Sequence, residues 1–201
     1  MGSVLIAYNI EPGTVLRDFI ELCSDEAKQI CVESQMDYTS VCPPAFDEHT
    51  VVGEMATHIL GVVVAHGDSY GIYNEKDEYV VSTRTTNYNF ANKGMYCVVC
   101  LCAQHLLPHL QAIGIKYFVG YEKEFSVVGD RIPFMTSAMS GLRSFLSGDN
   151  VSQAKAKMLQ VYDEQIAELD KTNPRAAIEL AHDRESLVFY GEDHLRLSDL
   201  V

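Results

Sequence analysis

The chain has 201 residues, of which 47% are hydrophobic and 21% are charged, as in soluble globular proteins with a substantial buried core. Its 28 acidic and 15 basic residues give a formal net charge of −13. This charge argues against binding to nucleic acid or an anionic membrane, since both need a basic face, and it favours a cationic substrate or partner.

The first half of the chain alternates strand-like and helix-like segments. Residues 4–8 form a β-rich apolar run that ends in a turn. Apolar residues then recur at helical spacing over residues 14–33, with Thr14 as the N-cap. The pattern next predicts a strand (37–41), a short helix (49–57), a buried strand (59–65), a hairpin (70–82) and a polar surface segment, loop or short helix (83–94).

The second half continues the alternation. A strand (95–100), a helix (103–113) closed by Gly114 and a strand (116–120) form a short β-α-β unit, which implies a parallel right-handed crossover. Helices over 134–146, 151–171 and 175–182 and a last strand over 186–190 follow. The sequence therefore predicts one α/β domain over residues 1–201, a three-layer α-β-α sandwich with a mostly parallel central sheet.

Six cysteines occur in a chain without a secretion signal or an apolar run of about 18 residues, so we expect a cytoplasmic protein with free thiols. Three of them form the cluster Cys97, Cys100 and Cys102, with His105 close behind. These are zinc ligand types, but Cys97 and Cys100 would point to opposite faces of an extended strand, which argues against a shared metal. Two interpretations remain for the three cysteines. They are small buried hydrophobic residues, which is the interpretation we prefer for Cys97, or one of them is a nucleophile.

The nucleophile reading depends on where two strands end. A thiol at the carboxyl end of strand 95–100, near the start of the next helix, would have its pKa lowered by exposed N–H groups and the helix dipole. His66 follows the strand 59–65 and precedes Gly67, which allows close backbone approach. If the two strands are neighbours in a parallel sheet, their ends bring a thiol and an imidazole together.

At these residues the sequence resembles the caspase-like cysteine peptidases, which share a His-Gly at one strand end and a Cys at the end of the next long strand. The matching segments are VVVAHG (62–67) and YCVVC (96–100). The likeness is greatest to small prokaryotic CHAT-like or gingipain-like domains, whose spacing selects Cys100 rather than Cys102 as nucleophile. The further matching residues are Ala103, Leu106, Pro108, Gly114, Gly120 and Tyr121.

The resemblance implies a cysteine endopeptidase that acts through a Cys100–His66 dyad and an acyl-enzyme, without a cofactor or metal. It implies that the backbone N–H groups of Gly67 and Cys100 hold the oxyanion. Asp68, Leu101 and Cys102 are then expected beside the substrate, a protein or peptide. Asp68 and the acidic balance slightly favour a basic side chain at P1, the substrate residue before the cleaved bond.

One departure from the family keeps a second interpretation open. Leu101 stands where these peptidases often have a small or polar residue. The chain could therefore be a caspase-like module that binds a peptide or partner without cutting it. A non-catalytic α/β ligand-binding domain is the remaining alternative. The sequence shows no long linker with acidic flanks, which argues against activation by cleavage. It also shows no sensor module, so we expect control by a regulatory partner or by oligomerisation.

Overall fold

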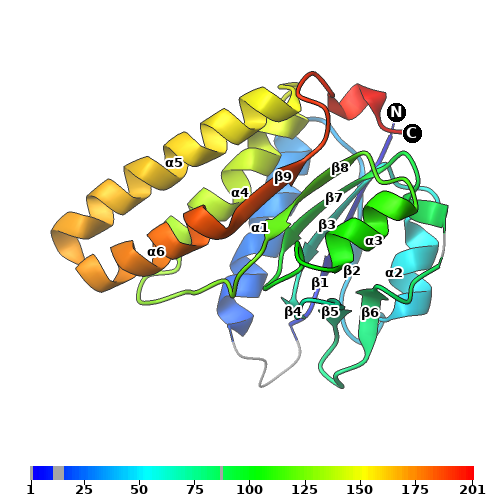
Figure 1. The fold of residues 1–201 in the computed structure, drawn as a ribbon, viewed down its shortest axis with the longest axis horizontal. Coiled ribbons are helices and arrows are strands. Elements are labelled where there is room, and N and C mark those ends of the chain that lie inside the picture. The colour runs from blue at the N-terminus through cyan, green and yellow to red at the C-terminus, as the bar shows by residue number, and fades with distance from the viewer. Residues whose placement is uncertain (1, 11–15, 87) are drawn as a thin grey trace.

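The computed structural model describes residues 2–10, 16–86 and 88–201, and its centre is a six-stranded sheet (Figure 1). Five strands run parallel and the last, at one edge, is antiparallel to its neighbour. The order across the sheet is β2 (Tyr38–Val41), β1 (Val4–Tyr8), β3 (Leu60–Val64), β7 (Gly94–Val98), β8 (Tyr117–Tyr121) and β9 (Leu187–Tyr190).

Helices cover both faces of this sheet, as expected for the three-layer sandwich (Figure 1). One face packs against α1 (Arg17–Glu33) and α4 (Ile132–Leu146), with the hairpin of α5 (Val151–Thr172) and α6 (Pro174–Ser186) continuing that layer. The shorter α2 (Glu48–Glu54) and α3 (Leu106–Ala112) cover the other face. Two 3-10 turns are also present, η1 (Tyr88–Phe90) and η2 (Leu197–Asp199).

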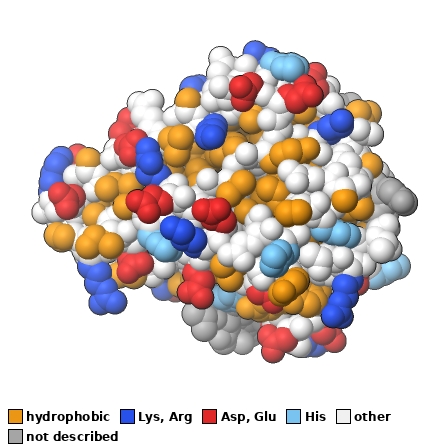
Figure 2. Space-filling model, viewed as in Figure 1, with side chains coloured by type: hydrophobic (Ala, Val, Ile, Leu, Met, Phe, Trp, Pro, Cys, Tyr) orange, Lys and Arg blue, Asp and Glu red, His pale blue; other side chains and the backbone are white. Residues whose placement is uncertain are grey.

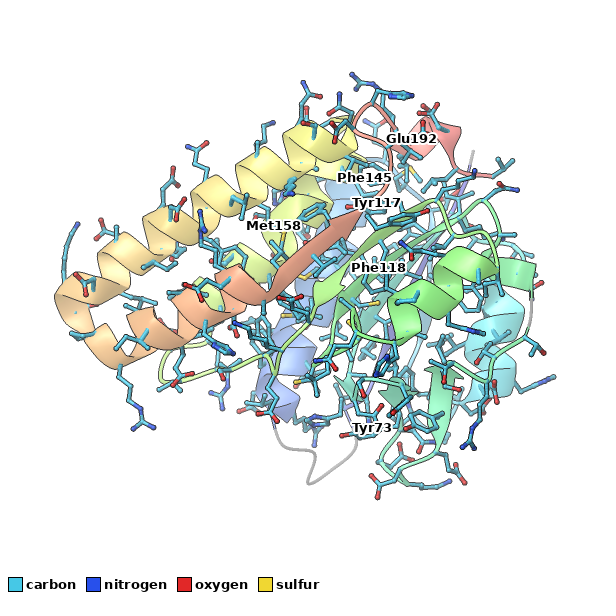
Figure 3. The ribbon with its side chains drawn as sticks, in the orientation of Figure 1. Tyr73, Tyr117, Phe118, Phe145, Met158 and Glu192 are labelled. Atoms are coloured by element: carbon cyan, nitrogen blue, oxygen red, sulfur yellow. The ribbon has the colours of Figure 1, made fainter. Side chains whose placement is uncertain are left out.

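The alternation of side chains along the strands separates the two cores. Val64 and Val98 face the α1 layer, whereas Val63 and Cys97 face α2 and α3. On the α1 side, Tyr117 of β8 stacks on Phe145 of α4 with ring centroids 4.1 Å apart, and Figure 3 shows the two residues close together. Both cores are continuous sets of buried apolar residues, which fixes the register of the central strands.

A small second sheet leaves the carboxyl end of β3. It consists of β4 (His66–Gly67), β5 (Gly71–Tyr73) and β6 (Tyr79–Ser82), all antiparallel. The predicted hairpin over residues 70–82 is therefore confirmed, and β4 adds the His-Gly pair to it.

The remaining differences from the predicted elements are local. The helix expected from residue 103 begins only at Leu106, because residues 101–105 form turns. The polar segment 83–94 is less exposed than expected, since Phe90 is fully buried and the Lys93 ammonium donates to the carbonyls of Met55 and Ala56 after α2. Thr14, the predicted N-cap, lies outside the described residues.

On the face shown in Figure 2, Lys and Arg side chains are interspersed with Asp and Glu over α5 and α6, so this face is not uniformly basic. Among the described residues, no helix has both the length and the apolar character needed to cross a membrane.

Candidate active site

The carboxyl ends of β3 and β7 lie side by side at the centre of the sheet. Val64 is the register partner of Val98, and these two residues form the last pair of the two strands. Cys100 lies two residues beyond Val98 and packs against the core on the α1 side. His66 lies past a bend at Ala65 and begins β4 of the small sheet.

Tight backbone packing at Gly67 gives independent evidence that the strand ends meet. A Cβ atom on Gly67 would lie 2.3 Å from a Val99 methyl, 2.9 Å from the Gly71 carbonyl oxygen and 3.3 Å from the Cys100 carbonyl oxygen. No side chain fits there without displacing backbone. The glycine therefore lets the chain after His66 pass directly against the end of β7.

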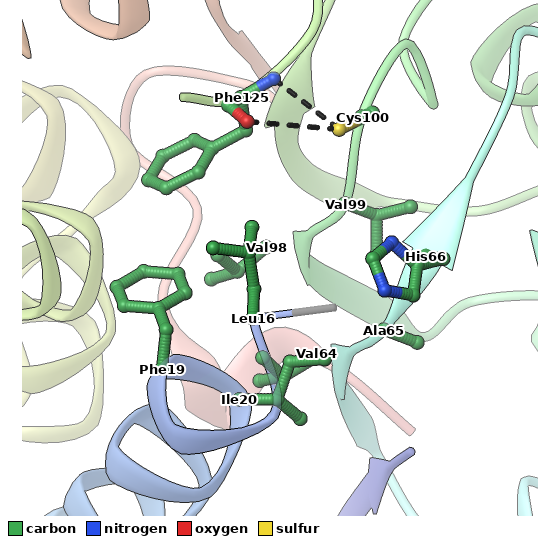
Figure 4. Close-up of a pocket in the computed structure, with 10 residues that line it drawn as sticks. All are labelled: Leu16, Phe19, Ile20, Val64, Ala65, His66, Val98, Val99, Cys100 and Phe125. Atoms are coloured by element: carbon green, nitrogen blue, oxygen red, sulfur yellow. Dashed lines mark hydrogen bonds between the residues drawn. The ribbon is translucent and has the colours of Figure 1, made fainter. Parts of the chain in front are cut away.

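His66 and Cys100 line one pocket, shown in Figure 4. Its cavity volume is about 20 Å³, room for about one water molecule. The start of α1 closes one side through apolar side chains. The other lining residues are Leu16, Phe19, Ile20, Val64, Ala65, Val98, Val99 and Phe125.

The Cys100 thiol is held by the backbone of Phe125, in the loop after β8. The Phe125 N–H donates to Sγ at 3.3 Å, and Sγ lies 3.9 Å from the Phe125 carbonyl oxygen (Figure 4). Burial raises the pKa of the Cys100 thiol, the bond from Phe125 N–H lowers it, and Cys102, Glu124 and Asp183 raise it further. The resting thiol is therefore protonated at neutral pH.

This result differs from the sequence-based expectation of a lowered thiol pKa. That expectation placed the amino end of a helix next to Cys100. In the structure turns separate Cys100 from α3, which begins at Leu106, so the helix dipole acts further away and desolvation dominates the pKa.

The His66 side chain is placed by the small sheet. His66 pairs with Tyr73 across β4 and β5, and the two rings are nearly parallel, with centroids 6.3 Å apart and an interplanar angle of 17°. Burial raises the pKa of the Tyr73 phenol, and Cys100 and Asp68 raise it further, so Tyr73 is electrostatically coupled to the cysteine. Tyr73 is thus a neighbour of both predicted catalytic residues that the sequence did not indicate.

Two backbone N–H groups near Cys100 have definable directions. Asp68 N–H donates to Gly71 O at 2.9 Å within the antiparallel pair, so the N–H of the preceding Gly67 points away from β5. Leu101 N–H donates to Lys123 O at 3.0 Å, so this N–H already has a backbone acceptor. Leu101 has φ of 58°, a left-handed conformation that costs a non-glycine residue about 1 to 2 kcal/mol.

The residues predicted beside the substrate have other contacts. Both carboxylate oxygens of Asp68 accept hydrogen bonds, Oδ1 from the Tyr70 and Gly71 N–H groups and Oδ2 from the Tyr79 hydroxyl at 2.8 Å. These contacts favour a turn-capping role for Asp68. Substrate contact by Asp68 stays a prediction.

The other two cysteines of the cluster lie on the opposite face of the sheet from Cys100. Cys97 and Cys102 are fully buried in the core beneath α2 and α3, and the Cys102 thiol donates to Val99 O. This burial favours a packing role for both residues, and substrate contact by Cys102 stays a prediction. Within the described residues, no three His, Cys, Asp or Glu side chains are grouped as a metal site would need.

Phe125 was not predicted to belong to the site. Its contact with the thiol is made by backbone atoms, and a backbone contact leaves no signal in residue type. Only the position of the loop over Cys100, set by the tertiary structure, reveals it.

The mostly parallel central sheet flanked by helices is the caspase-like fold, and solved structures share it. One is the Arg-specific cysteine proteinase gingipain R, with a TM-score of 0.71 and 10% sequence identity, covering 99% of this chain and 48% of that chain. A complex of the pro- and mature domains of RgpB from Porphyromonas gingivalis has a TM-score of 0.67 and 10% identity, covering 99% and 49%.

This chain thus spans about half the length of these structures, and at 10% identity the likeness establishes the fold alone. Neither a protein-family model nor a curated protein sequence matches the chain.

Proposed function

We propose that this protein is a caspase-like cysteine endopeptidase in which Cys100 is the nucleophile and His66 the general acid and base. The observation that carries the proposal is the meeting of the two strand ends, with Gly67 packed against Cys100 and both predicted catalytic residues lining one pocket. The caspase-like fold, which gingipain R shares, supports it.

The arrangement suits acyl transfer. The Cys100 proton would pass to the His66 imidazole as the Cys100 sulfur forms a bond to the peptide carbonyl carbon. The N–H groups of Gly67 and Cys100 would donate to the developing oxyanion, each such donor being worth about 3 kcal/mol. The C–N bond then breaks, the imidazole returns its proton to the leaving amine, and water hydrolyses the thioester with His66 as base.

Specificity is part of the same proposal. A basic P1 residue, favoured by the acidic charge of the chain, agrees with the Arg specificity of gingipain R. Since the Asp68 carboxylate already accepts three hydrogen bonds, another group is the better candidate for binding such a side chain. The spacing of residues after Cys100 also leads us to propose that the chain is related to CHAT-like or gingipain-like domains.

The burial of the thiol favours a second candidate, a partner-binding module without catalysis. In this conformation Cys100 has a raised pKa, faces the Phe125 backbone and opens onto a cavity of only about 20 Å³. For Cys100 to act as a nucleophile, the Phe125 loop would need to move away from its sulfur when substrate or a regulatory partner binds.

Alkylation and turnover together separate the two candidates. For the dyad we expect cleavage of fluorogenic peptides with Arg or Lys at P1, abolished in Cys100→Ala and reduced at least about 100-fold in His66→Ala. Iodoacetamide labelling of Cys100, mapped by mass spectrometry, should slow in His66→Ala. Half-buried Cys42 is the internal reference, since its labelling should not change. Absent turnover, with equally slow labelling of all thiols, would favour the non-catalytic module.

A further inference from the structure

The loop that contacts the Cys100 thiol is fixed to α6 on its other side. At its start, Glu122 N–H donates to Ser186 O at 2.8 Å, and the next residue accepts the Leu101 N–H. Further along, Ser126 N–H donates to Asp183 Oδ1 at 2.9 Å. The residues 122–126 thus lie between the turn after Cys100 and the end of α6.

Asp183 is an unusual residue for this place. Its side chain is fully buried, and within the described part of the chain Oδ2 has no hydrogen-bond partner. A buried polar atom without a partner destabilises the folded state, so its retention needs a reason. Packing alone would be served better by an apolar side chain.

The titratable groups that interact with Asp183 lie on α6, β8, α5 and the turn after β7. Burial raises the pKa of its carboxyl to about 8, the Ser126 N–H lowers it, and Glu179 of the same helix raises it. Asp183 in turn raises the pKa values of Tyr121 on β8, Tyr162 on α5 and Cys100. At neutral pH the carboxyl is therefore mostly protonated, and the Ser126 N–H donates to a neutral group.

We propose that Asp183 is a positioning residue for the nucleophile, because it anchors Ser126 and thereby aims the neighbouring Phe125 N–H at the Cys100 sulfur. The inference rests on Cys100 being the nucleophile of the proposed function. The Phe125 N–H lowers the pKa of the thiol, so any loosening of the loop removes a group that stabilises the thiolate. In this role Asp183 acts on the thiol through Ser126 and the Phe125 loop.

Two substitutions separate this anchoring from the charge. Asp183→Asn keeps an oxygen that can accept the Ser126 N–H and removes the ionisable group, whereas Asp183→Ala removes both. Both variants are neutral, so a difference between them reports the hydrogen bond. The loss of one hydrogen bond of ordinary strength predicts that Cys100 alkylation at pH 7 is about 2- to 13-fold slower in Asp183→Ala than in Asp183→Asn.

The measurement is the rate of Cys100 alkylation by iodoacetamide from pH 6 to 10, with Cys42 as the reference thiol. We expect the apparent pKa of Cys100 to be higher in Asp183→Ala than in Asp183→Asn. Glu185→Ala, which removes an exposed acid from the same helix, should reproduce the wild-type profile. Identical Cys100 profiles in the two Asp183 variants would overturn the proposal.

Two further readouts keep the outcome clear. If Asp183→Ala does not fold, amide hydrogen exchange in the wild-type protein decides: the Ser126 N–H should be protected, and free exchange there would refute the anchor. Alkylation does not depend on peptide cleavage. A Cys100 profile that responds to Asp183 in a protein without turnover would uphold the positioning role and reject the peptidase.

Discussion

Gly67 is the residue on which the close approach of the His-Gly segment to the end of β7 depends. The space for its Cβ is already occupied by the Val99 methyl and by the Gly71 and Cys100 carbonyl oxygens. Any side chain must push the His-Gly segment away from the end of β7. A shift of about 1 Å at reacting groups can cost about 100-fold in rate.

We therefore expect Gly67→Ala to lower kcat/KM for peptide cleavage at least about 100-fold and to alter the alkylation rate of Cys100. Gly53→Ala is the matched control, because nothing lies within 4 Å of its Cβ position in α2. In a helix this change stabilises by about 0.5 to 1 kcal/mol, so the control should fold and react like the wild type. A Gly67→Ala protein with wild-type kinetics and labelling would show that the strand ends need no such contact.

Among the structural elements, the hairpin of β5 and β6 determines how His66 is held. Asp68 fixes this hairpin to β4, since its carboxylate accepts from the Tyr70 and Gly71 N–H groups and from the Tyr79 hydroxyl. The hairpin in turn carries Tyr73, whose ring lies parallel to that of His66. Loss of Asp68 should therefore act first on local stability.

For Asp68→Ala we expect the free energy of unfolding to fall by about 2 to 4 kcal/mol, because two N–H groups and a hydroxyl lose a charged acceptor. The ratio of cleavage after Arg to cleavage after Asp should stay as in the wild type. Urea unfolding and a peptide panel measure the two quantities, with Glu75→Ala at the exposed hairpin turn as control. Selective loss of cleavage after Arg and Lys, without loss of stability, would instead make Asp68 a substrate-binding residue.

The elements predictable from sequence are those whose pattern is local. Continuous apolar runs predict β3 and β7, and the α/β alternation allows them to be neighbours, so the adjacency of the strand ends that precede His66 and Cys100 could be anticipated. The contacts of the loop after β8 could not. Phe125 contacts the thiol through its backbone, which leaves no signal in the sequence. The sequence also does not distinguish Asp183 from the other acidic residues of its helix.

The late start of α3 is a second feature that depends on long-range contacts and that the local sequence pattern does not predict. The sequence allows a helix from residue 103, but Ala103 N–H donates to Tyr121 O and His105 N–H donates to Ser69 O. These long-range bonds satisfy the backbone in a turn instead. The pKa of Cys100 depended on that boundary, which is why its direction was predicted wrongly.

For the whole molecule, the buried Asp183 carboxyl links stability to pH. Its pKa in the folded protein is about 8, against 3.8 for an ordinary aspartate. Between these values the folded state binds more protons at this group than the unfolded state does. The stability that the protonated group contributes is therefore complete below about pH 4 and is lost as the pH rises through about 8.

The slope from this group alone is a loss of about 1.4 kcal/mol in the free energy of unfolding for each pH unit. Asp183→Asn stays neutral throughout, so urea unfolding from pH 5 to 9 should show the variant gaining stability relative to the wild type until about pH 8 and no further above it. Glu185→Gln, which makes the same kind of substitution at an exposed acid on the same helix, is the matched control. A constant difference for Asp183→Asn would mean that the carboxyl is ionised in the folded protein, and the neutral anchor of the Phe125 loop would then be wrong.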